Sequence, residues 1–286
     1  MKQNKKRFRT FLKALSLEIR EHKSSALVYF SLRLLVIITM ILQLFNGNYT
    51  NVFLCILTLL LLIIPSLAQM TFRIELPAAL EIIILVFIFS AEILGEINEY
   101  YLLFPHWDTI LHTINGFLAA AIGFSLVDLL NRDKRVGMNL SPLFVAIVSF
   151  SFSMTIGVLW EFFEFAMDQL LGFDMQKDTV LHTIRSVLLH PEGHNIPVVL
   201  SGIQTVTVNG QDLGLGGYLD IGLIDTMQDL IVNFIGAAVF SFLGYFYVKN
   251  RGKAGSSGFA SHFIPRRKAR NRDYLEIAER EEETQA

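Results

Sequence analysis

The sequence is poor in charged residues and contains a single cysteine. Asp, Glu, Lys and Arg make up 17% of the 286 residues, hydrophobic residues make up 52%, and the mean hydropathy is +0.47. Soluble domains carry about 25% charged residues, so the composition excludes an ordinary soluble domain. The single Cys55 excludes an intramolecular disulfide, and we expect it to pack as a small apolar side chain. The composition predicts a membrane protein.

Long apolar runs divide most of the chain. A helix needs roughly 20 apolar residues to cross a bilayer, and six stretches approach that length: 26–46, 51–69, 77–97, 107–130, 142–169 and 223–248. We therefore predict an all-α membrane helix bundle with six transmembrane helices over residues 26–248, and we expect the lipid bilayer as a partner and no nucleic acid.

Lys and Arg are scarce in every second connection between these runs. The connections at 47–50 and 98–106 contain neither residue, and the connection at 170–222 contains only Lys177 and Arg185. The other connections and the two terminal segments hold all the remaining basic residues except Arg33. By the positive-inside rule we expect both termini in the cytoplasm, with the protein in the plasma membrane.

The two terminal segments differ from the apolar region in composition. Residues 1–25 are basic and amphipathic, and we expect them to lie on the inner leaflet. No small-residue cleavage site follows the first apolar run, which argues against a cleaved signal peptide. Residues 249–286 are charged and low in apolar residues, so we expect a disordered cytoplasmic tail.

Polar side chains in the apolar runs gather at one end. Their spacings of three, four and seven residues put them on one face of each helix, and in the predicted orientation all of them lie toward the outside. The candidate pocket residues are Glu92, Glu96, Asp108, His112, Asn115, Glu161, Glu164, Asp168, Asp225, Asp229 and Asn233. For Asp108, Asp168 and Asp225, hydration near the headgroups is an equal alternative to function.

Acidic side chains at this depth need a countercharge, and no Lys or Arg is predicted there. A proton, a divalent metal, a cationic ligand or Arg185 could supply it. The metal set would be His112, Glu161, Glu164 and Asp229. Carboxylates with an imidazole suit Zn, Mn or Fe, and their oxygens also suit Mg or Ca, although no established metal motif is present.

A second pair of charged residues is expected near the inner leaflet. Arg33 and Glu81 lie inside the first and third apolar runs, at similar predicted depths. Because charges in a membrane are usually paired, we expect a structural ion pair between those helices.

The connection at 171–222 is too long to lack structure. The spacing of apolar and polar residues in 178–188 favours a surface helix, and the segment DTVLHTI at 178–184 repeats DTILHTI at 108–114. Asn209-Gly210 between β-branched residues predicts a hairpin. We expect a small extracytoplasmic helix-plus-hairpin insertion that covers the pocket as a lid.

Three short motifs resemble those of the VanZ-like and related bacterial membrane proteins over about residues 105–248. They are Asp108 with His112, Glu161 with Glu164, and Asp229 with Asn233 and Gly236. The chain departs from that pattern in having Glu164 where Gln is usual, in lacking an Arg before the last helix, and in the insertion at 171–222. The resemblance implies a cell-envelope role, with an envelope small molecule or lipid as partner.

Two functions fit these features best. The first is binding of a divalent cation or a cationic envelope ligand in an outward-facing acidic and histidine pocket. The second is hydrolysis or group transfer on a lipid-linked envelope substrate, with His112 and Glu161 or Glu164 as acid and base. The sequence offers no Ser or Cys nucleophile motif for this second function.

A third function, proton-coupled transport, would need acidic residues along the whole path. Beyond Asn115 the fourth run stays apolar until Asp128, and beyond Asn233 the sixth stays apolar until Lys249. Transport is therefore the least favoured reading.

Overall fold

The computed structural model describes residues 10–14, 16–17, 23–72, 74–132, 138–251, 262–268, 274, 276–278 and 280. It consists of two compact units, which are described separately. Unit 1 comprises residues 1–154 and 233–286, and unit 2 comprises residues 155–232. Most of the basic N-terminal segment lies outside the described residues.

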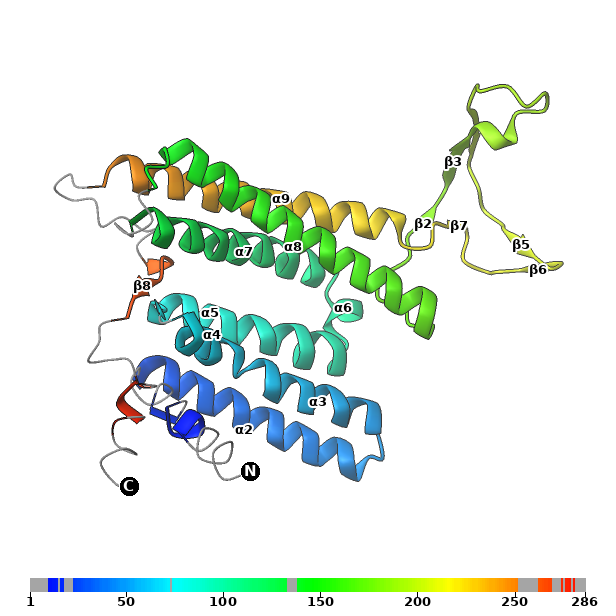
Figure 1. Ribbon diagram of the computed structural model, residues 1–286. Coiled ribbons are helices and arrows are strands. Elements are labelled where there is room, and N and C mark those ends of the chain that lie inside the picture. The colour runs from blue at the N-terminus through cyan, green and yellow to red at the C-terminus, as the bar shows by residue number, and fades with distance from the viewer. Residues whose placement is uncertain are drawn as a thin grey trace. The chain divides into compact units, whose positions relative to one another are not determined.

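Among the described residues, six helices are long and apolar enough to cross a membrane, as the sequence predicts. They are Ser25–Phe45, Tyr49–Thr71, Ala78–Ile97, Trp107–Asn131, Pro142–Leu171 and Leu223–Lys249. The corresponding elements in Figure 1 are α2 (Lys23–Phe45), α3 (Tyr49–Leu61) with α4 (Ile64–Phe72), α5 (Ala78–Phe89) with η1 (Ser90–Ile97), α7 (Trp107–Arg132), α8 (Pro142–Leu171) and α9 (Leu223–Lys249). A short helix, α6 (Tyr100–Leu103), precedes α7.

Two of the six spans are not continuous α-helices. The second breaks between α3 and α4 next to Pro65, which has no N–H to continue the hydrogen-bond ladder. The third continues from α5 into η1, a π-helix, where the N–H of Asn98 donates to the carbonyl of Ile93 at 3.0 Å. Such π-helical turns are rare and occur frequently at functional sites.

Two of the buried apolar clusters among the described residues of unit 1 hold its long helices together. In the first, α2, α3 and α5 pack together around side chains that include Val36, Cys55 and Leu85, so Cys55 is the buried packing residue that we expected. In the second, α5, α7 and the 233–249 part of α9 meet around Phe124 and Phe240, whose ring centroids lie 5.9 Å apart.

Small and hydroxyl-bearing residues hold α7 against its neighbours in unit 1. The Ser149 hydroxyl donates to the Ala120 carbonyl and the Ser153 hydroxyl to the Gly116 carbonyl, both at 2.7 Å. Gly236 has room for no side chain, because a Cβ there would meet the backbone of Thr113. Close approach at small residues and side-chain hydrogen bonds are the usual means by which helices associate in lipid.

The chain beyond α9 returns to unit 1, which corrects the prediction of a disordered tail for residues 262–268. Phe263 and Ile264 are 6% and 2% exposed within the cluster around Phe124 and Phe240. The Phe263 ring packs edge-on against Phe117 at a centroid distance of 5.2 Å. Strand β8 (Arg266–Arg267) then pairs antiparallel with β1 (Ile74–Glu75). The composition of this charged segment does not reveal that its few apolar residues pack against the helices of unit 1.

The insertion in unit 2 is built from short strands. The hairpin at Asn209-Gly210 is confirmed: β5 (Thr207–Val208) pairs with β6 (Gln211–Asp212), and both turn residues have positive φ. The expected surface helix over 178–188 is absent from the described residues. Its place is taken by β2 (Val180–Leu181), β3 (Thr183–Ser186) and the 3-10 turn η2 (Val187–Leu189).

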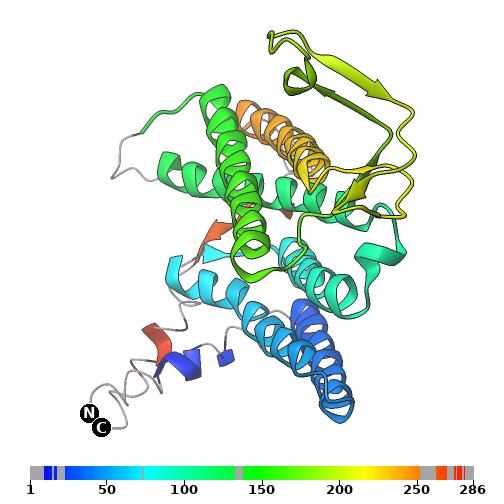
Figure 2. The same cartoon turned by 90° about the vertical axis from the view of Figure 1, so that its right-hand side faces the viewer.

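The remaining strands explain this difference. β2 pairs with β7 (Tyr218–Leu219), and β3 pairs with β4 (Val198–Ser201), both antiparallel. The β-branched residues of 178–188 suit these ladders better than a helix. Within unit 2 the strands project away from the ends of α8 and α9 (Figure 1; Figure 2 views the same strands from their far side), so the insertion does not fold back over these helix ends as a lid.

Three aspartates tie the base of the insertion to the helix ends of unit 2. Asp168 accepts hydrogen bonds from the backbone N–H groups of residues 175 and 176 at 2.6 and 2.9 Å. Asp225 accepts from the N–H of residue 177 at 2.7 Å. Asp220 accepts from the N–H groups of residues 179 and 224 at 2.7 and 2.8 Å. The loop backbone therefore depends on ionised carboxylates for its hydrogen bonds.

Asp178 lies among these carboxylates. Desolvation, followed by the negative charges of Asp174, Asp220 and Asp168, raises the pKa of its carboxyl group, and a hydrogen bond from the Gly222 backbone opposes the shift. A raised pKa means that the folded protein binds the proton more tightly than the unfolded chain. Protonated Asp178 therefore makes its full contribution to the free energy of unfolding at pH values below the pKa of the unfolded chain, about 3.9. This contribution is lost as the pH rises through the higher pKa of the folded protein.

Two stability predictions follow. Phe263→Ala removes a buried aromatic ring and should cost about 3 kcal/mol or more, measured as a lower thermal unfolding temperature of the detergent-purified protein. His262→Ala is the matched control because His262 is exposed. Equal unfolding temperatures for the two variants would show that the tail does not contribute to the folded bundle.

Asp178→Asn should raise the unfolding temperature at pH 7 and leave it nearly unchanged below pH ~4, where the carboxyl is protonated in both states. Added salt should reduce the difference at pH 7, since the repulsion is screened. The control is Asp212→Asn, in the β5–β6 hairpin. A lower unfolding temperature for Asp178→Asn at pH 7 would contradict the repulsion.

Candidate functional site

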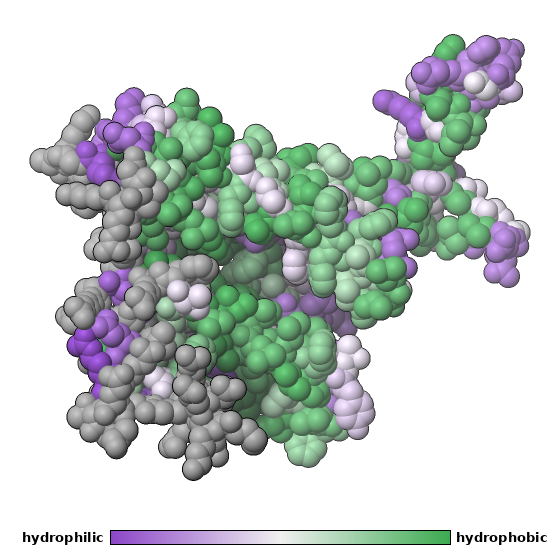
Figure 3. Space-filling view, in the orientation of Figure 1, coloured by the Kyte–Doolittle hydropathy of each residue, from purple (hydrophilic) through white to green (hydrophobic). Residues whose placement is uncertain are grey.

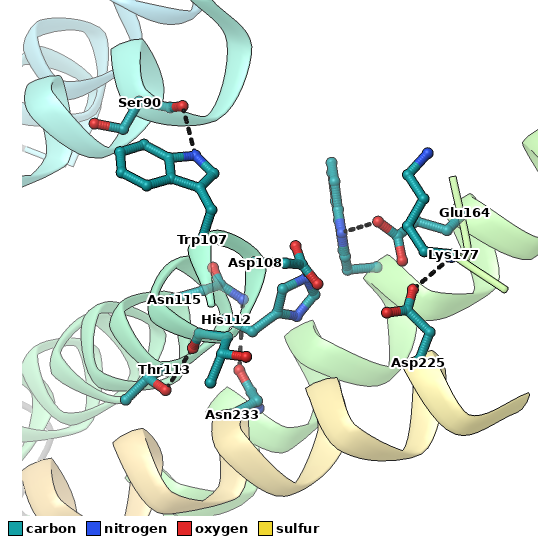
Figure 4. Close-up of polar contacts among 12 residues, drawn as sticks. Ser90, Trp107, Asp108, His112, Thr113, Asn115, Glu164, Lys177, Asp225 and Asn233 are labelled. Carbon is teal, nitrogen blue, oxygen red and sulfur yellow. Dashed lines mark hydrogen bonds and ion pairs between the residues drawn. The ribbon is translucent and has the colours of Figure 1, made fainter. Parts of the chain in front are cut away.

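The candidate residues divide between the two units. Unit 1 contains Glu92, Glu96, Asp108, His112, Asn115 and Asn233, and unit 2 contains Glu161, Glu164, Asp168, Asp225 and Asp229. The close-up in Figure 4 labels six of them, and each set is treated by itself.

Unit 2 brings three carboxylates together. Glu161 and Glu164 lie one turn apart on α8, and Asp229 lies on α9; their exposed fractions are 5%, 7% and 3%. One carboxylate oxygen from each residue lies within 4.8 Å of the other two. The Trp160 indole N–H donates to Glu164 Oε1 at 2.9 Å, which fixes the direction of that carboxylate.

Three buried carboxylates at this separation repel one another strongly when ionised. Burial costs each charge part of its hydration, so the set favours a bound proton or a bound cation. Unit 2 contains one Lys and one Arg: Lys177 donates to the Asp174 carbonyl, and Arg185 is exposed on β3. Chemically, three converging carboxylate oxygens form a ligand set for a divalent cation.

Asp168 and Asp225 have hydrogen-bond partners that the sequence did not predict. Both accept hydrogen bonds from the loop backbone at the base of the insertion, and Figure 4 shows the bond between Asp225 and Lys177. Their carboxylates thus position the chain that leaves α8 and enters α9. Sequence spacing alone cannot distinguish such a loop anchor from a ligand.

In unit 1, Asp108 and His112 form an i, i+4 pair on α7. His112 Nε2 lies 3.5 Å from Asp108 Oδ1, with the imidazole almost completely buried and the carboxylate about one-third exposed. This spacing agrees with the single helical face predicted for the two residues. A carboxylate beside the ring fixes its orientation and can accept a hydrogen bond from the facing ring nitrogen.

The two asparagines of unit 1 bond to each other. Asn115 Nδ2 donates to Asn233 Oδ1 at 3.5 Å, across the contact between α7 and α9 (Figure 4). Asn233 Nδ2 also lies 3.6 Å from Met154 Sδ. Because Asn233 is buried, this amide pair joins the helices in the way that polar residues commonly do in lipid.

Glu92 and Glu96 lie on the π-helix η1, where Glu92 is half-buried and Glu96 is exposed. The prediction of their common face assumed an α-helix. Hydrogen bonding from i to i+5 lengthens the helical turn only slightly, so residues four apart such as Glu92 and Glu96 still lie near one side of the helix.

Arg33 and Glu81 each have a partner other than the expected one. Arg33 Nη1 donates to the Tyr29 hydroxyl at 2.6 Å, and its guanidinium lies over the Tyr29 ring. Glu81 Oε1 accepts from Gln69 Nε2 at 3.3 Å. The ion pair between Arg33 and Glu81 is therefore not formed among the described residues.

A buried ion pair that the sequence analysis did not predict joins α7 to the end of α9. Arg251 Nη2 lies 2.5 Å from Asp128 Oδ1, and the Asp128 side chain is almost completely buried. The guanidinium also lies over the Tyr247 ring, 5.4 Å from its centroid. One feature of the sequence could have indicated this pair, since Asp128 is the single acidic residue in an otherwise apolar half of the fourth span.

Comparison with known families gives one match, which covers most of the chain. Residues 27–250 match the family described as "Predicted membrane protein (DUF2238)". No curated protein matches the chain, and no solved structure does. The match includes the first three spans, which the resemblance to VanZ-like proteins leaves out. The chain therefore belongs to the DUF2238 family of predicted membrane proteins.

Proposed function

We propose that this multi-pass membrane protein binds a divalent cation through Glu161, Glu164 and Asp229. The proposal rests on one observation, the convergence of three buried carboxylates on two helices of unit 2. A divalent cation would remove the repulsion among the three charges and replace their lost hydration with direct ligand bonds.

We also propose His112 as a fourth ligand, which would bind the cation through a ring nitrogen. This part of the proposal rests on the sequence pattern, which groups His112 with Glu161, Glu164 and Asp229. A nitrogen ligand would shift the preference from Mg or Ca toward Zn, Mn or Fe. Asp108, beside His112 on α7, would orient the ring as carboxylates commonly orient metal-binding imidazoles.

Cation binding explains the buried carboxylates with fewer assumptions than catalysis does. Hydrolysis or group transfer on an envelope lipid would need a nucleophile besides this ligand set, such as a metal-activated water. We therefore retain the enzyme as the alternative, and a cation-dependent reaction would be built on the same three carboxylates.

The first test measures the metal content of the detergent-purified protein by elemental analysis, with titration calorimetry of the metal-stripped protein against Zn, Mn, Mg and Ca. We expect one cation per chain and at least about 10-fold weaker binding in Glu161→Gln and in Asp229→Asn. Affinity should fall as the pH is lowered, because protons compete for the ligands.

Glu192→Gln, an exposed residue of the insertion, is the matched control and should bind as the wild type does. His112→Ala tests the nitrogen ligand separately: loss of Zn preference with retained Ca or Mg binding would leave an all-oxygen site. Unchanged binding in both Glu161→Gln and Asp229→Asn, or no binding of any of the four ions, would refute the proposal.

We further propose that the insertion and the carboxylate set face the outside of a bacterial plasma membrane. The support is that Lys and Arg are scarce in the connections on this side of the helices. The test uses a Cys55→Ala background with Glu192→Cys in the insertion. A membrane-impermeant maleimide should label this cysteine in intact cells. The matched control, Asn250→Cys after α9, should be labelled only after the cells are opened. The reverse pattern would overturn the orientation.

A further inference from the structure

An apolar groove lies between α5 and α7 in unit 1. Its volume is about 290 Å³, and its walls include Ile83 and Val86 of α5 and Ile110 and Ile114 of α7. Figure 3 shows a hollow with hydrophobic walls in this region. Val86 and Ile110 are 43% and 51% exposed, so the groove opens sideways on helices that are long and apolar enough to cross a membrane.

The groove follows the direction of the helices. Trp107, Ile110 and Ile114 are spaced by three and four residues, so they line one face of α7 over about 10 Å at 1.5 Å per residue. A linear chain lying parallel to the helices would fit such a shape, whereas a compact ring system would leave part of its length unfilled.

Aromatic residues close one end of the groove. The Trp107 indole N–H donates to the Ser90 carbonyl at 3.3 Å, which joins the start of α7 to η1 (Figure 4). The rings of Tyr100 and Phe104 pack against Trp107 at centroid distances of 5.0 and 6.4 Å. Trp and Tyr are enriched at the level of the lipid headgroups, so this end marks the membrane interface.

The returning tail closes the opposite end. Phe117 lies one turn beyond Ile114 on α7, and Phe263 packs against it. Ile264 is buried in the same cluster, to which Ile83 and Ile114 also belong as partly buried neighbours. The chain itself thus limits the depth of the groove, and no described segment of the tail extends into the groove itself.

These boundaries identify the occupant by its chemistry. An apolar cavity of ~150 Å³ stays dry in water and takes up small apolar molecules, and an unfilled void of this kind costs its walls their dispersion contacts. The medium beside the open rim of a membrane helix is lipid hydrocarbon. We propose that the groove holds one acyl chain of a bilayer phospholipid, with its headgroup at the Trp107 end.

This site is separate from the proposed cation site, since none of the groove residues is among its ligands. The two proposals also use different observables, so either can fail alone. In the groove, Trp107 is a built-in reporter, because the chain contains only one other tryptophan, Trp160.

The test is quenching of Trp107 fluorescence in a Trp160→Phe background, reconstituted in phosphatidylcholine nanodiscs with increasing fractions of dibromo-phosphatidylcholine. We expect stronger quenching than the bulk fraction of brominated lipid produces by random contact. Ile83→Phe and Ile114→Phe fill the groove from opposite walls, and each should roughly halve the quenching because the added ring occupies the volume of the acyl chain.

Ile122→Phe is the matched control, since Ile122 is exposed on α7 outside the groove. Its Trp107 fluorescence should be quenched to the same extent as that of the background protein. A variant counts only if its unfolding temperature and elution profile match the background, and two filling variants guard against loss of one to misfolding.

Equal quenching in the filling variants and the control would overturn the proposal, as would quenching no stronger than random contact. Dibromostearic acid is tested in parallel. Quenching by the free fatty acid without quenching by the brominated phospholipid would overturn the assignment to a bilayer lipid.

Discussion

Inside a bilayer the protein must satisfy its own polar groups, because hydrocarbon offers no hydrogen-bond partner. This requirement explains most of the polar side chains buried in unit 1. The hydroxyls of Ser149 and Ser153 donate to carbonyls of α7, and the amides of Asn115 and Asn233 bond to each other. Each contact both removes an unsatisfied group and fixes a helix pair, so the polar residues determine which helices adjoin.

The carboxylates of Glu161, Glu164 and Asp229 obey the same requirement at higher cost. A hydroxyl needs one acceptor, whereas an ionised carboxylate needs several donors or a countercharge. Trp160 supplies one donor, to Glu164. Buried ionisable groups of this kind are usually functional in membrane proteins, which is why the cation proposal is built on them and not on Asp168 or Asp225, whose carboxylates already hold the loop backbone.

The sequence predicts those parts of the fold that depend on local or periodic signals. Apolar run length gave the six spans, and Asn209-Gly210 gave the hairpin. Other parts depend on distant partners. DTILHTI at 108–114 lies in α7, yet DTVLHTI at 178–184 lies across β2 and β3, although the two differ only at Ile110 and Val180. The first continues into a long apolar run, and the second pairs with β4 and β7. The partner of Asp128, Arg251, likewise lies far away in the sequence.

The position of Phe263 and Ile264 in the chain has a consequence for the assembly of the protein in the cell. Both residues are synthesised after α9, yet they complete the cluster shared by α5, α7 and α9. Membrane insertion of the six spans therefore precedes the final packing of unit 1, which must wait until the segment beyond α9 has left the ribosome. Translation that stops after residue 251 would yield a fully inserted chain whose central cluster is incomplete, and such a chain offers quality-control proteases an exposed apolar surface.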